Sequence, residues 1–153
     1  MNLRSRGFTL LELLIVVSIV ALATAGVSLS LRDTRATALD HEAIRLAALL
    51  ESARAQSRAS GAPVRWRATA QGFEFQGLPT RAGASDSLAR QRAWLSSDTQ
   101  ARVVLPPDTR ELLLGPEPLI AAQRIELAQG ERRLVLGTDG LAPFSVVAEP
   151  SAP

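Results

Sequence analysis

Hydrophobic residues are concentrated in one uninterrupted run near the start of the chain. Residues 8–31 are apolar or small, and Glu12 is the only charged residue among these 24. A helix rises about 1.5 Å per residue, so the run would extend about 36 Å, enough to cross the hydrocarbon core of a bilayer with some tilt. We therefore expect a transmembrane helix over 8–31.

After Leu31 the pattern becomes amphipathic. Apolar or small residues recur at alternating spacings of four and three, the period of one helix face. These positions are Leu39, Ala43, Leu46, Leu50, Ala53 and Ser57. Charged residues, among them Asp40, Glu42, Glu51 and Arg54, fall mostly on other faces. Gly61 and Pro63 are typical of a helix end, which predicts a helix that continues to Ser60.

Beyond Pro63 the hydrophobic period shortens to two, which favours strands. Residues 64–68 and 73–76 flank Gln71-Gly72 and predict a hairpin with Val64, Trp66 and Ala68 on one side and Phe73 and Phe75 as their partners. Further predicted strands are 101–105, 125–128, 132–136 and 143–148, with a tight Thr138-Asp-Gly140 turn before the last. Residues 78–100 lack a sustained period and predict a long loop with a short helical turn near 88–94. The expected fold class is α+β, a long helix packed against antiparallel sheet.

Composition narrows the function classes. At 153 residues the chain has room for one soluble domain and an anchor. Cysteine is absent, so no disulfide, thiolate nucleophile or Cys-based metal site can form. All 17 basic residues are arginine, against 15 acidic residues, and the formal net charge is only +2. This balance gives no electrostatic reason to expect nucleic acid as a partner.

Glu12 is the most informative residue, because a carboxylate inside a membrane span costs about 2.5–3.5 kcal/mol on insertion scales. The nearest potential cation is the amine that would appear if the bond between Gly7 and Phe8 were cut. An ordinary secretory signal, cleaved after Ala23 or Ala25, and a plain uncleaved anchor remain as alternatives. The apolar run is long for a signal peptide, and neither alternative explains Glu12.

The sequence Gly7-Phe-Thr-Leu-Leu-Glu12, with its basic leader and long apolar helix, closely resembles the N-terminus of type IV pilins and type II secretion pseudopilins. The resemblance implies that a prepilin peptidase cuts between Gly7 and Phe8 and methylates the new N-terminus at Phe8. It also implies that Glu12 serves subunit assembly. The chain would then consist of a cleaved leader, 1–7, a transmembrane and filament-core helix, 8–31, and a periplasmic globular domain, 32–153.

Within this family the chain most resembles the H-type minor pseudopilins. The resemblance rests on residues 42–54, 72–75 and 139–144. It implies a pilin-like fold and a role in initiating or capping the periplasmic pseudopilus that exports folded proteins across the outer membrane. The implied partners are other minor pseudopilins, the major pseudopilin, the prepilin peptidase/methyltransferase and the inner-membrane secretion platform. The implied location is the bacterial inner membrane, crossed once, with the C-terminal domain in the periplasm.

Catalysis is not expected. His41, the only histidine, lies between two acids on the polar part of the helix; Asp139 is explained by its turn, and Glu111 and Glu117 have no spacing that predicts a dyad. No phosphate loop, metal-ligand cluster or nucleophile motif is present, so we expect neither catalytic residues nor a metal or cofactor.

The alternative function is that of a minor type IV pilus pilin that binds DNA during uptake. Its candidate basic patch consists of Arg90, Arg92, Arg132 and Arg133. Interspersed acids favour a solvated rim instead, so nucleic acid is not the preferred partner.

Overall fold

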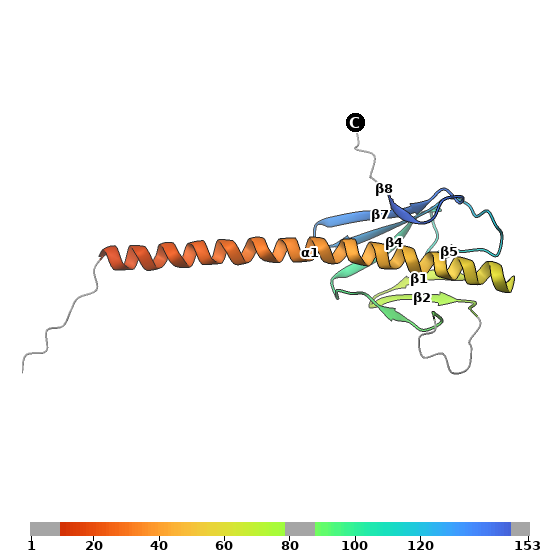
Figure 1. Ribbon diagram of the computed structural model, residues 1–153, viewed down its shortest axis with the longest axis horizontal. Helices are drawn as coiled ribbons and strands as arrows, with labels where there is room; N and C mark the ends of the chain where they lie inside the picture. Colours follow the sequence, from red (N-terminus) through yellow and green to blue (C-terminus); the bar gives the residue numbers. More distant parts are fainter. Residues whose placement is uncertain (1–9, 79–87, 148–153) are drawn as a thin grey trace, which may run out of the picture. The chain divides into compact units, whose positions relative to one another are not determined.

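The computed structural model describes the backbone of residues 10–78 and 88–147, and the side chains of the same residues except 25–36. The chain forms two compact units, Met1–Arg35 and Ala36–Pro153. One helix, α1 (Leu10–Ser60), contributes to both (Figure 1). No helix within the described residues combines the length and the hydropathy of a membrane span. The anchor over 8–31 therefore stays a prediction.

The later part of α1 provides one wall of the core. All six residues of the predicted stripe, from Leu39 to Ser57, have no exposed surface, which confirms the predicted face. The helix ends where Gly61 adopts a left-handed conformation with φ of 67°, the expected C-terminal stop. The assignment of Glu42 and Arg54 to the polar faces is wrong, since both are buried. Their charged groups bond to segments of the sheet region that pack against the helix.

The first sheet has the strand order β3-β2-β1-β5 and is antiparallel throughout. Its strands are β1 (Arg65–Thr69), β2 (Gly72–Gln76), β3 (Arg92–Ala93) and β5 (Glu111–Leu113). The predicted hairpin is confirmed, with Trp66 opposite Phe75 and Ala68 opposite Phe73. The helical turn predicted near 88–94 is wrong, because residues 92–93 pair with β2 instead. Strand β5 was not predicted.

The second sheet has the strand order β4-β6-β7-β8 and is also antiparallel. Its strands are β4 (Thr99–Leu105), β6 (Gln123–Gln129), β7 (Arg132–Thr138) and β8 (Ser145–Val147). All four predicted strands are present, with β4 and β6 beginning two residues earlier than expected. Residues 79–87, within the predicted loop, and Ala148, the end of the last predicted strand, lie outside the described residues.

A single hydrophobic core joins the helix stripe to both sheets. Leu50 of α1, Trp66 and Phe73 of the first sheet, and Ile125 and Leu136 of the second are all without exposed surface. The aromatic residues within the described part of the chain gather in this core, where the rings of Phe73 and Trp94 lie 4.9 Å apart. One core therefore holds the helix stripe and the two sheets together.

The outer edge of β5 is closed by side chains. The N–H of Leu114 donates to the carbonyl of Val64 (2.8 Å), so alternate residues face β1, and Glu111 and Leu113 turn their backbone groups outward. The hydroxyl of Thr109 donates to the Glu111 carbonyl (3.0 Å) and accepts from its N–H (3.2 Å). The Gln123 amide donates to the Leu113 carbonyl (2.7 Å). These bonds occupy the outward carbonyls that an added strand would need.

Candidate functional site

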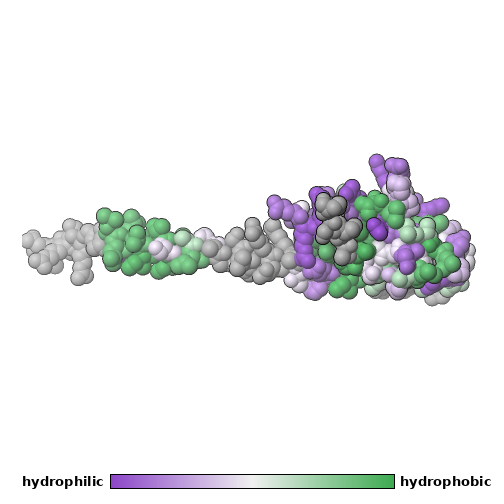
Figure 2. Space-filling view, turned by 90° about the horizontal axis from the view of Figure 1, so that it is seen from above, coloured by the Kyte–Doolittle hydropathy of each residue, from purple (hydrophilic) through white to green (hydrophobic). Residues whose placement is uncertain are grey.

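The first part of α1 exposes an unusually apolar surface. Every residue from 10 to 24 is exposed, including nine large aliphatic side chains between Leu11 and Leu22 as well as Leu10. Figure 2 shows this stretch as a nearly continuous hydrophobic surface. Exposed apolar patches of this extent mark contact with a membrane or with other proteins.

The two hydroxyl side chains within this stretch, Ser18 and Thr24, do not interrupt its apolar character. Ser18 donates its hydroxyl to the carbonyl of Leu14 (2.8 Å), and Thr24 donates to that of Val20 (2.7 Å). Each hydroxyl is therefore bonded within its own helix and needs no water. Such a surface is suited to an environment that offers few hydrogen-bond partners.

Glu12 lies in the first turn of α1 and its side chain is exposed. A carboxylate in this position interacts favourably with the positive end of the helix dipole. Gly7 and Phe8, the predicted cleavage pair, lie outside the described residues. Their processing and the pairing of Glu12 remain predictions.

In the second unit, the buried carboxylate of Glu42 holds the segment that follows β3. It accepts a hydrogen bond from the N–H of Leu95 (2.6 Å) and pairs with Arg45 at 3.0 Å. Arg45 also donates to the carbonyl of Ala93 (3.2 Å). Two residues one helical turn apart thus fix a segment with almost no regular structure of its own.

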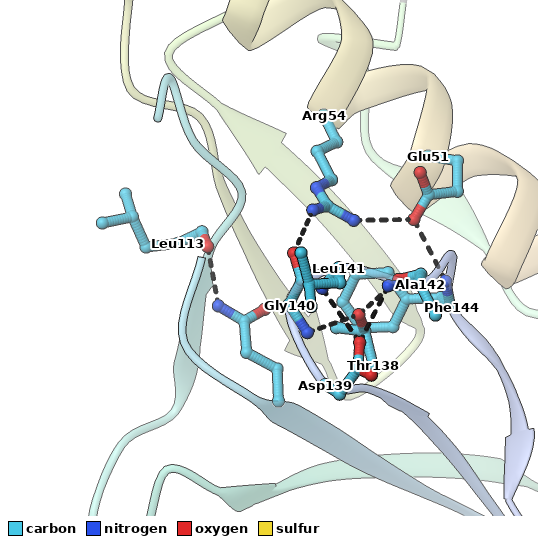
Figure 3. Close-up of polar contacts among 10 residues, drawn as sticks. Glu51, Arg54, Leu113, Thr138, Asp139, Gly140, Leu141, Ala142 and Phe144 are labelled. Atoms are coloured by element: carbon cyan, nitrogen blue, oxygen red, sulfur yellow. Dashed lines mark hydrogen bonds and ion pairs between the residues drawn. The ribbon is translucent and has the colours of Figure 1, made fainter. Parts of the chain in front are cut away.

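A second polar cluster ties α1 to the turn between β7 and β8 (Figure 3). Arg54, which is 2% exposed, donates to the carbonyl of Gly140 at 2.6 Å. Glu51 accepts from the N–H of Phe144 at 3.1 Å and pairs with Arg54 at 3.5 Å. The helix is therefore bonded to the turn at two residues, Gly140 and Phe144.

The same turn is also bonded internally. The N–H groups of Ala142 and Leu141 donate to the Asp139 carboxylate, and these bonds lower its pKa below its ordinary value near 3.8. The Thr138 hydroxyl donates to the carbonyl of Ala142 (2.6 Å) and accepts from the N–H of Gly140 (2.9 Å). The predicted tight turn is confirmed, and Asp139 has a structural use there.

The candidate basic patch is divided in the structure. Arg132 turns towards α1 and pairs with Asp40 at 2.9 Å, whereas its neighbour Arg133 points to the opposite face of the second sheet. Arg92 belongs to β3 of the first sheet, and Arg90 precedes it. The four arginines do not line one continuous surface.

The residues considered for catalysis also lie apart. His41 is exposed on α1, and Glu111 pairs with Arg65 at 3.9 Å. Across residues 10–78 and 88–147, no three His, Cys, Asp or Glu side chains gather in a group that could hold a metal ion. Sequence patterns did not reveal the buried roles of Glu42 and Arg54, because each adjoins the apolar stripe without altering its spacing.

Comparison with known proteins gives two family matches. The prokaryotic N-terminal methylation motif matches residues 2–28, a range that includes Gly7, Phe8 and Glu12. The family described as type II transport protein GspH matches residues 42–142. No curated protein matches the chain significantly.

Among solved structures, the chain is similar to the type IV minor pilin FimU of Pseudomonas aeruginosa strain PAO1. The match has a TM-score of 0.53 and 15% sequence identity, and covers 77% of this chain and 92% of FimU. At this identity the likeness shows a shared fold, which confirms the pilin-like α+β architecture.

Proposed function

We propose a structural, non-catalytic function, on the premise that this chain belongs to the family of the type II transport protein GspH. The observation that carries it is the presence in one chain of the methylation motif over 2–28 and the GspH domain over 42–142. The proposed role is that of a minor pseudopilin, which initiates or caps the type II secretion pseudopilus and so helps drive folded proteins across the outer membrane.

Assembly would depend on the N-terminal segment. Cleavage between Gly7 and Phe8, followed by methylation of Phe8, leaves a positive amine four residues before Glu12. In a filament, Glu12 would pair with the amine of a neighbouring subunit. At about 4 Å and an effective dielectric constant near 20, such a pair attracts by about 4 kcal/mol before desolvation. This attraction would favour one axial register over others.

The remaining apolar surface of residues 8–31 would first lie in the inner membrane and later pack against neighbouring helices. The globular domain would then face the periplasm. The proposed partners are the major pseudopilin, other minor pseudopilins, the prepilin peptidase/methyltransferase and the secretion platform. The exposed aliphatic side chains of residues 10–22 support this assignment, because they require such cover.

N-terminal mass spectrometry of the protein isolated from cells tests the proposal. The expected mature chain begins with a methylated Phe8, and Gly7→Val should leave the precursor uncut because a side chain at the cleavage position obstructs the peptidase. Ser5→Ala, a leader substitution that spares Gly7, should be processed normally. A wild-type chain that keeps residues 1–7, or loses the whole apolar run, contradicts the proposal.

A minor subunit of a type IV pilus is the second candidate, and the fold shared with the minor pilin FimU favours it. Deletion of the gene separates the two: loss of protein secretion supports the pseudopilus, and loss of pili supports the pilus. The DNA-binding variant of this candidate is weakened by the division of its four arginines between two sheets. Salt-dependent retention of DNA by the purified protein would restore it.

A further inference from the structure

An apolar groove runs beside β5. It has a volume of about 480 Å³ and lies between this strand and the connection that leads to β6. Leu113, Leu119 and Ile120 contribute to its lining, and Leu119 is 63% exposed. Two large aliphatic side chains, Leu113 and Leu119, thus stand partly uncovered at one groove.

Pairing of a partner strand with β5 is disfavoured at this groove. Thr109 and Gln123 already bind the outward carbonyls of Glu111 and Leu113. With those acceptors occupied, the edge is a poor template for an added strand. The groove therefore suits side chains of a partner better than an added strand.

Two acceptors in the lining of the groove, on Gln123 and Glu117, have no partner within the described part of the chain. Gln123 is 3% exposed, and its Oε1 has no hydrogen-bond partner among the described residues. Glu117 is exposed and forms no ion pair within the described part of the chain. Glu111 and Arg65, also in the lining, pair with each other at 3.9 Å, so Glu117 leaves the groove with one uncompensated negative charge.

We propose that this groove receives an arginine side chain from a neighbouring subunit, an inference that rests on the proposed function in a filament. The aliphatic stem of arginine would cover Leu113 and Leu119, and its guanidinium would bind the Glu117 carboxylate. Arginine joins an apolar stem to a planar fork of five donors, so a donor of the same group is available to the unpaired Gln123 Oε1. A lysine would supply the stem and the charge without the fork.

Site-specific photo-crosslinking tests the proposal in the full-length protein, expressed in its own cells. A photoreactive residue at position 119 should form an adduct with another pilin-like chain, mapped by mass spectrometry to a peptide with an arginine close to the crosslink. Glu117→Arg should lower the adduct yield at least tenfold through charge repulsion. Glu131→Arg, an exposed charge reversal in the β6–β7 turn, is the matched control and should leave the yield unchanged.

An unchanged yield in Glu117→Arg overturns the proposal, as does an adduct with lipid or with a peptide that lacks a nearby arginine. Co-purification of the wild-type chain with other pilin-like subunits is measured in parallel. If it co-purifies and no adduct forms from position 119, the groove assignment alone fails. If it does not co-purify, the proposed function fails. Without an adduct from position 119, the groove assignment then fails as well; with an adduct, the groove assignment stands.

Discussion

The charged residues Glu42 and Arg54 are buried under the sheets, where each fixes a segment through the backbone of that segment. Burying a charge is costly unless it is hydrogen-bonded, and here the partners are an N–H of residue 95 and a carbonyl of residue 140. These bonds hold two irregular segments, around residues 95 and 140, at defined places on α1.

Replacement of Arg54 by methionine keeps most of the stem and removes the donors. The Gly140 carbonyl would then be left without its charged partner, and we expect a loss of about 1.5–3 kcal/mol in the free energy of unfolding. Urea unfolding of a fragment that comprises the compact unit 36–153 measures this loss. Arg58→Met, an exposed position one turn later, is the control, and an equal midpoint for both variants would show that the Arg54 bond contributes nothing.

Gly140 supports a second prediction at this scale. Its φ is 96°, and a Cβ at this position would overlap the carbonyl oxygen of Ile120. Gly130 has a φ of 59° with open space around it, so Gly130→Ala should incur only the backbone cost of about 1–2 kcal/mol. Gly140→Ala should cost about 1–3 kcal/mol more because of the overlap. Thermal unfolding of the two variants compares them, and equal stabilities would refute the close approach.

At the level of elements, the exposed face of the second sheet carries a cross-strand ion pair. Arg102 of β4 lies opposite Glu126 of β6, and two hydrogen bonds of 2.9 and 2.8 Å join them. The bonds from Arg102 lower the pKa of Glu126 below its ordinary value of 4.5, and desolvation opposes this only partly. The pair therefore stabilises the β4–β6 contact when Glu126 is ionised.

This pair predicts a pH dependence of stability. Because the pKa of Glu126 is lower in the folded state, its contribution is complete above about pH 4.5 and disappears as the pH falls through the folded value. Arg102→Met should lower the free energy of unfolding only slightly at pH 7, since the pair is exposed to solvent. The difference from wild type should shrink towards pH 3. Urea unfolding at both pH values tests this, and a difference that grows on acidification would contradict it.

The elements that the sequence predicts well are those with many repeats of one period. The helix stripe repeats over five turns, and the hairpin of β1 and β2 alternates around a clear turn, so both were recognised. Strands β3 and β5 have two and three residues, too short to display a period, and they exist because longer neighbours offer them a partner. The burial of Arg54 depends on a carbonyl 86 positions away, which local pattern cannot reveal.

At the level of the whole molecule, the N-terminal segment concentrates aliphatic side chains around a single carboxylate. Glu12→Ala should leave the proposed cleavage after Gly7 intact, since Glu12 is four residues beyond Phe8 in the sequence and the substitution does not alter the cleaved bond. It should nevertheless reduce recovery with partner subunits at least tenfold, the effect of losing about 1.4 kcal/mol of net attraction. Co-purification from membranes, with Ser18→Ala as a control that removes only an intrahelical bond, measures this. Undiminished recovery would contradict the proposed pairing.

The side-chain hydrogen bonds at the edge of β5 affect how copies of the molecule can contact one another at high concentration. In the proposed filament, subunits would lie at very high local concentration. An unpaired edge strand could then pair with the edge strand of a neighbouring copy. Thr109 and Gln123 bind the outward carbonyls of β5, which makes strand pairing at this edge less favourable. The adjacent groove remains available to side chains. Under the proposed function, copies could then contact one another at this side through side chains, with less tendency to extend one sheet into the next.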